Sequence, residues 1–102
     1  MLNMNMEFRK GILFIRLSGS FNKNNYQKIK NLINDFKYVV LNVDRLRFVD
    51  INTIEMLEEY SLQKENRKLY ICNGSNRKLF NKFECFSNEL EAYNLLERRI
   101  YE

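Results

Sequence analysis

The feature that most narrows the possible folds is a nearly continuous apolar run from Tyr38 to Val43. A strand that is buried on both faces has this pattern, and such strands are typical of parallel sheets with helical cover. The run therefore predicts a central strand, and the segments on either side of it should supply helices and further strands. We expect a loop through Arg45 and Arg47 to follow it.

A hairpin opens the chain. Met4–Arg9 and Ile12–Ser18 read as two strands around a tight turn at Lys10 and Gly11. The apolar residues of the second strand alternate, so one side of it should face the core. We expect residues 19–25 to form a loop.

Apolar residues at helical spacing predict two helices that flank the central strand. The first should run from Asn25 to Asp35 and the second from Ile51 to Glu65. Two residues are candidate caps for the second helix. One is Asp50, and the other is Asn52, which has Glu55 three residues further on as in a capping box.

The C-terminal third continues the alternation of strands and helices. Lys68–Cys72 reads as a strand, Asn76–Phe83 as a short helix and Glu84–Phe86 as a brief extended piece. Ser87 or Asn88 should cap a last helix. Residues 1–102 are thus expected to form a single α/β domain. Its mixed, mostly parallel sheet should be opened by a hairpin and carry about four helices, mainly on one side.

Length and composition agree with one small domain. The chain has 102 residues, of which 45% are hydrophobic, enough for one core but not for two. No segment reaches the roughly 18 consecutive apolar residues of a membrane span. Residues 1–6 lack the pattern of a signal peptide. We expect a cytoplasmic location without membrane insertion.

The formal net charge of +4 does not indicate a nucleic-acid partner. Basic residues are scattered among acidic ones, and the densest basic stretch, Arg77–Lys82, is short and interrupted by Leu79 and Phe80. A solvated charged surface explains this pattern better than a phosphate-binding patch.

The chain lacks the residues that most catalytic and metal sites require. It has no histidine, and its two cysteines, Cys72 and Cys85, lie in settings typical of small core residues. No cluster of metal ligands, nucleophile motif or phosphate-cradling glycine loop is visible. We therefore expect no enzymatic activity, no metal and no cofactor.

Four short segments carry recognisable patterns in a fixed order. They are Leu17–Asn22, Leu41–Asp50, Arg77–Phe80 and Cys85–Ala92. Together they resemble the bacterial STAS domains, the family of anti-sigma factor antagonists, in which an apolar strand leads through a short polar and aromatic run to an aspartate. The resemblance covers nearly the whole chain. It implies the STAS fold and a non-catalytic, protein-binding role in regulating transcription.

The departures from the family pattern fall at its regulatory switch. In the family, a partner kinase phosphorylates a serine directly after the aspartate, and Ile51 occupies that position here. Asn52 and Thr53 replace the Ser or Thr and the Gly that usually follow, and Asn22 replaces an aspartate. Because isoleucine has no hydroxyl, the usual switch is absent. Thr53 is the one candidate substitute acceptor, displaced by roughly 200° around the helix.

The resemblance also implies a partner-binding surface at the start of the second helix and in the loop after the second strand. The expected partner is an anti-sigma factor or a related kinase-fold protein. Two interpretations of Ile51 are open: an apolar anchor for the partner, or an extension of the buried stripe of the helix. The expected partner-binding residues are Phe21, Asn22, Lys23, Asp50, Ile51, Asn52, Thr53 and Ile54.

A second functional hypothesis is a scaffold STAS subunit that is not phosphorylated and belongs to a transporter or a larger signalling assembly. Gene neighbourhood would separate the two hypotheses. Sigma factor and kinase genes beside this one favour the first, whereas permease and ATPase genes favour the second. The sequence predicts no oligomeric state.

Overall fold

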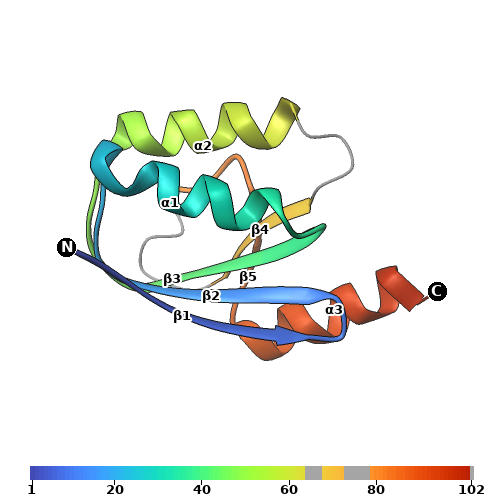
Figure 1. The fold of residues 1–102 in the computed structure, drawn as a ribbon. Helices are drawn as coiled ribbons and strands as arrows, with labels where there is room; N and C mark the ends of the chain where they lie inside the picture. Colours follow the sequence, from blue (N-terminus) through green and yellow to red (C-terminus); the bar gives the residue numbers. More distant parts are fainter. Residues whose placement is uncertain (64–67, 73–78, 102) are drawn as a thin grey trace.

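The computed structural model describes residues 1–63, 68–72 and 79–101, and these residues form five strands and three helices (Figure 1). In chain order the elements are β1 (Leu2–Arg9), β2 (Ile12–Phe21), α1 (Lys23–Asn34), β3 (Tyr38–Val49), α2 (Ile51–Gln63), β4 (Lys68–Cys72), β5 (Glu84–Phe86) and α3 (Glu89–Tyr101).

All five strands join one sheet in the order β1-β2-β3-β4-β5. β1 pairs antiparallel with β2, and each later neighbouring pair is parallel. β3 is the central strand, and Val39, Val40 and Leu41 of its apolar run are all buried. The predicted mixed, mostly parallel sheet opened by a hairpin is confirmed.

A two-residue turn at Lys10 and Gly11 joins β1 to β2. Both residues have positive φ, 47° and 88°. This combination is that of a type I′ turn, whose twist matches the twist of the strands that it joins. Arg9 lies opposite Ile12 at the closed end of the ladder, so the predicted hairpin is confirmed.

Helices cover both faces of the sheet (Figure 1). α1 and α2 lie on one face, over a core cluster that includes Ile15, Leu41 and Leu57. α3 lies on the other face, where Ala92 and Leu96 join a second cluster. Two of the three described helices thus share one face, as expected, and α3 explains why the central strand is buried on both sides. Among the helices of the described ranges, none is long and apolar enough to cross a membrane.

β3 continues to Val49, well beyond the predicted end of the strand at Val43. The predicted loop through Arg45 and Arg47 is therefore wrong. The pairing of β3 with β2 shifts register twice, and each shift places an extra residue in β3. Val43, Leu46 and Val49 consequently face the core at a spacing of three residues. A strand with this spacing does not show the alternation by which strands are recognised.

β2 is also longer than predicted, and it removes much of the loop expected at residues 19–25. It runs to Phe21, and α1 begins at Lys23. Gly19, with a φ of 94°, lies against the start of the chain. A Cβ at this position would overlap the carbonyl oxygen of Met1, so glycine permits the close approach.

Asn22 sets the early start of α1. Its side-chain oxygen accepts a hydrogen bond from the backbone N–H of Asn24 at 2.9 Å. The side-chain oxygen of Asn25 accepts one from the backbone N–H of Asn22 at 2.9 Å, which completes a reciprocal capping box. The helix therefore begins two residues before its predicted start at Asn25.

The C-terminal elements follow the predicted order with one difference. Lys68–Cys72 and Glu84–Phe86 are strands as predicted, and Asn88 caps α3 by accepting a hydrogen bond from the backbone N–H of Glu91 at 2.8 Å. The predicted end of α2 at Glu65 lies outside the described residues. So does the start of the short helix predicted at residues 76–83. In its described part the helix is absent, because residues 79–82 form turns and residue 83 a bend.

Candidate partner-binding site

Asp50 joins the end of the sheet to the start of α2. Its backbone N–H donates to the Phe21 carbonyl at 3.0 Å, which ties the ends of β2 and β3 together. Its carboxylate accepts hydrogen bonds from the backbone N–H of Asn52 at 3.2 Å and from the hydroxyl of Thr53 at 3.1 Å. Asp50 is therefore the cap of α2, and the alternative cap Asn52 lies inside the helix.

Ile51 is the first residue of α2, and its side chain faces outward with 62% of its surface exposed. The buried stripe of the helix consists of Thr53, Ile54, Leu57 and Tyr60. Ile51 does not extend that stripe, so the core interpretation of this residue is wrong. It is available to a partner.

Phe48 is a second exposed apolar residue near the same end of the sheet, with 71% of its surface accessible. It precedes the Asp50 cap by two residues. The sequence showed it only as the aromatic position of a family pattern, because an aromatic residue next to a strand is as easily read as core. Phe48 and Ile51 are thus two exposed apolar residues on either side of the Asp50 cap in the sequence.

Three of the expected partner-binding residues are buried and cannot contact a partner through their side chains. Phe21 and Ile54 belong to the core beneath α1 and α2. Thr53 is fully buried, and its hydroxyl donates to the Asp50 carboxylate. A phosphoryl group on Thr53 would need space and solvent that this position lacks in the folded protein.

The two predicted segments meet at one end of the molecule, where α1 and α2 both begin (Figure 1). Asn22 is half-buried and occupied as the cap of α1, and Lys23 and Asn24 that follow it are exposed. We name the exposed residues at this end the helix-start surface. It consists of Lys23, Asn24, Phe48, Ile51 and Asn52.

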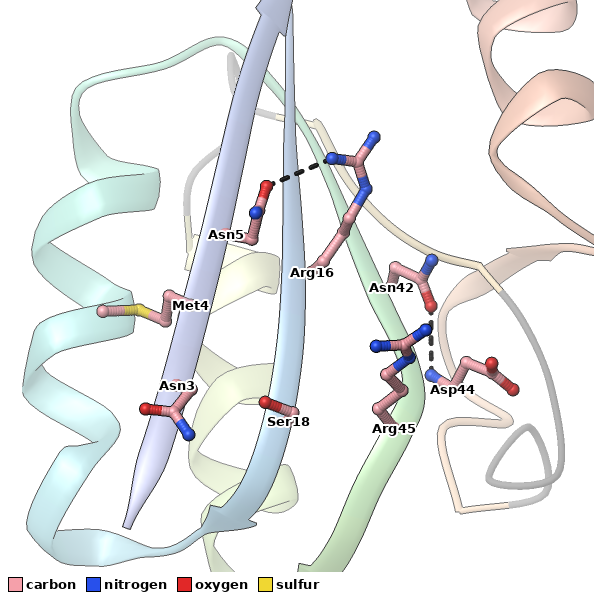
Figure 2. Close-up of a pocket in the computed structure, with 8 residues that line it drawn as sticks. All are labelled: Asn3, Met4, Asn5, Arg16, Ser18, Asn42, Asp44 and Arg45. Carbon is pink, nitrogen blue, oxygen red and sulfur yellow. Dashed lines mark hydrogen bonds between the residues drawn. The ribbon is translucent and has the colours of Figure 1, made fainter.

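A separate polar hollow of about 570 Å³ lies on the α3 side of the sheet, beyond the part that α3 covers. Figure 2 shows Asn3, Asn5 and Ser18 on β1 and β2 beside Arg45 on β3, with Met4 turned toward the opposite face. Sequence analysis missed this hollow because its side chains come from three strands and share no motif.

Arg16 closes the α3 end of the hollow through a network that spans the chain. Its guanidinium donates to both carboxylate oxygens of Glu89 at 2.8 and 2.9 Å and to Glu7 at 3.0 Å. Asn42 donates a further bond to Glu89 at 2.8 Å. Burial opposes ionisation of Glu89, yet the hydrogen bonds from Arg16 and Asn42 outweigh it and lower the pKa of the carboxyl group.

The cysteines have the character of core residues. Cys72 is fully buried, and burial raises the pKa of its thiol to about 12. A thiol with that pKa is a poor nucleophile near neutral pH. Cys85 is half-buried, its thiol lies 3.4 Å from the Phe83 carbonyl oxygen, and neither cysteine is in a disulfide. Among the described residues no group of three or more potential metal ligands occurs.

Comparison with known proteins finds similarity in structure alone. No protein-family profile matches the sequence, and no curated protein matches it. An anti-sigma factor antagonist from Mycobacterium paratuberculosis superposes with a TM-score of 0.75 at 13% identity, over 95% of each chain. The anti-sigma factor antagonist SpoIIAA in its unphosphorylated form gives 0.69 at 18% identity, over 94% of this chain and 98% of that one.

A third solved structure is an uncharacterized protein from Shewanella loihica with a SpoIIAA-like fold. It gives a TM-score of 0.61 at 14% identity, over 93% of each chain. These superpositions include nearly all of both chains, so the likeness extends over the whole fold and is not limited to a shared fragment. The chain therefore has the STAS fold, the fold of the anti-sigma factor antagonists.

Proposed function

We propose that this protein is a non-catalytic regulatory module that binds an anti-sigma factor or a related kinase-fold protein through the helix-start surface. The observation that carries the proposal is the exposure of Ile51 at the position where the resembling family has its phosphorylated serine. An isolated apolar side chain that is 62% exposed at a helix start gains free energy when a partner covers it.

The same position removes the usual control of binding. A phosphoserine would add about −1.5 to −2 charges at the helix start, where local positive charge stabilises it, and would disrupt an apolar contact. Ile51 cannot carry that group, and the buried hydroxyl of Thr53 is no ready substitute. We propose that binding is constitutive and is set by the abundance of the protein.

A capture experiment tests the proposal. Wild-type protein and the Ile51→Asp variant serve as baits in extract from the native organism, and the captured proteins are identified by mass spectrometry. Leu62→Asp is the matched control, because it introduces the same charge at an 83% exposed position near the other end of α2. An anti-sigma factor or kinase-fold protein should bind wild type and the control and be lost with Ile51→Asp.

Other outcomes decide against the proposal in distinct ways. Equal capture by all three baits would place the binding surface away from the helix start. Specific capture of a permease or a transport ATPase would favour the scaffold hypothesis, since such partners belong to a transporter.

A further inference from the structure

The first strand forms one open edge of the sheet. Within residues 1–63, 68–72 and 79–101, β1 pairs with β2 alone, and it is eight residues long. Edge strands expose backbone N–H and C=O groups that can pair with another strand, and proteins usually protect them with proline, bulges, inward-pointing charges or short length. The chain contains no proline, and the β1–β2 ladder from Leu2 to Arg9 has no register shift. This edge therefore lacks proline, a bulge and short length as protection. Its charged residues lie on the α3 side of the sheet, where Glu7 pairs with Arg16 and Arg9 lies over the Tyr93 ring.

The hairpin determines which backbone groups point outward. In a two-residue turn the closing pair, Arg9 and Ile12, is a hydrogen-bonded pair, and such pairs then recur at every second residue. The bond from the Ser20 N–H to the Met1 carbonyl at 3.1 Å fits this alternation. The odd-numbered residues of β1 thus bond to β2. The outward groups belong to Leu2, Met4, Met6 and Phe8.

The side chains of those four residues form an apolar row on the α1 side of the edge. Leu2 and Met4 pack against the core cluster. Met6 and Phe8 are 50% and 57% exposed, although the Phe8 ring lies 5.5 Å from that of Phe36. An exposed apolar row beside unpaired backbone groups is suited to a second strand with a similar row.

We propose that β1 pairs antiparallel with β1 of a second copy, so that the two five-stranded sheets become one continuous sheet across a two-fold axis. The strand is complementary to itself when Asn5 lies opposite Asn5. In this register Leu2 faces Phe8 and Met4 faces Met6, so the apolar residues of each copy cover those of the other.

Other registers are less favourable. If one strand slid by a single residue, outward-pointing backbone groups of one copy would meet inward-pointing groups of the other. Only slides of two residues keep the pairing, and each of them moves the two-fold axis by one residue along β1. Centring on Glu7 or Arg9 places like charges opposite each other. Centring on Met6 ends the ladder at Lys10, whose positive φ belongs to the turn. The register centred on Asn5 extends from Met1 to Arg9 without these conflicts.

Cysteine cross-linking tests both the pairing and its register. In the proposed dimer Asn5 faces its own copy in a non-hydrogen-bonded pair, with Cα atoms about 4.5 Å apart, within the range of a disulfide. Asn5→Cys should give a covalent dimer under mild oxidation. Asn3→Cys is the control, because the two copies of Asn3 would lie about 13 Å apart.

Sedimentation at a series of concentrations supplies the independent measurement. Wild type should show a monomer–dimer equilibrium. Met6→Lys places a charge beside the edge and should weaken the dimer by about tenfold or more. Leu62→Lys, at an 83% exposed position on α2, should leave it unchanged.

Three results would overturn the proposal. The first is a wild-type protein that stays monomeric at hundreds of micromolar, which would leave this edge to a strand of a different partner or to none. The second is a dimer that Met6→Lys does not weaken. The third is cross-linking through Asn3→Cys as efficient as that through Asn5→Cys.

Discussion

Ile51 lies in the first turn of α2, where the effect of a charge on stability can be separated from its effect on binding. Because the side chain is 62% exposed, Ile51→Asp gives up little buried area. An acidic residue near a helix N-terminus is stabilising by about 0.3–1 kcal/mol. We predict a free energy of unfolding equal to that of wild type or higher by this amount, measured by chemical denaturation.

The matched variant Leu62→Asp should behave in the opposite sense. Leu62 lies in the last turn of α2, where a negative charge opposes the helix dipole, so its free energy of unfolding should fall by about 0.3–1 kcal/mol. A large loss of stability in Ile51→Asp, of several kcal/mol, would instead mean that Ile51 packs in the core.

Two glycines of the described ranges that have positive φ provide a second comparison between residues. Gly11 has open space around the position of a Cβ, whereas a Cβ on Gly19 would overlap the Met1 carbonyl oxygen. Gly11→Ala should lower the free energy of unfolding by about 1–2 kcal/mol, because alanine is strained in a left-handed conformation. Gly19→Ala should cost more, because it must also displace Met1 and break the bond from Ser20. If thermal or chemical denaturation showed the same loss of stability for both variants, the close approach of Gly19 to Met1 would be contradicted.

For single residues, the sequence predicted the role of a side chain better than it predicted whether that side chain is buried or exposed. It offered Asp50 as a cap of α2, and the hydrogen bond that Asp50 accepts from the Asn52 N–H confirms this. It could not separate Phe21, which is buried, from Phe48, which is exposed. Both are aromatic residues near a strand end. Phe21 lies on the same side of β2 as the core residues Leu13, Ile15 and Leu17, whereas Phe48 lies where β3 pairs irregularly with β2.

For helices and strands, the prediction from sequence succeeded most readily where the apolar residues recur at a regular spacing. The opening hairpin and the three described helices follow a spacing of two or of 3.6 residues, and each was found. β4, whose last three residues are all buried, and the short β5 were found without such a spacing. The extension of β3 was missed because its core residues Val43, Leu46 and Val49 are three apart. The polar hollow was missed for a related reason: strand pairing brings its side chains together across long separations.

The network around Glu89 links elements that are distant in sequence, and it should make stability depend on pH. Its hydrogen bonds to Arg16 and Asn42 lower the pKa of Glu89 in the folded state despite burial. A carboxyl group with a lowered pKa contributes stability above its unfolded value, about 4.3. That contribution is lost as the pH falls through the lower pKa of the folded state.

We therefore predict that the melting temperature of wild type decreases as the pH is lowered from about 5 to about 3. The melting temperature of Glu89→Gln should decrease less over the same range. Glu89→Gln should be less stable than wild type near neutral pH, where the charged hydrogen bonds are fully formed. Glu55→Gln, an exposed change on α2, is the control and should follow the wild-type curve. Identical pH profiles for Glu89→Gln and wild type would show that the network does not stabilise the fold.

For the whole molecule, the proposed function makes a prediction about the missing switch. With ATP and a kinase-fold partner, the wild-type protein should gain no phosphate at residues 50–54, because Ile51 has no hydroxyl and Thr53 is buried. Ile51→Ser restores a hydroxyl at an exposed helix start, directly after the Asp50 cap. We predict that this variant accepts phosphate and that the modified form binds the partner at least about tenfold more weakly, since the new charge would lie in an apolar contact. Phosphopeptide mapping and titration of the partner measure both effects. Phosphate on Thr53 of wild type would mean that the start of α2 opens in the complex and that a displaced switch survives.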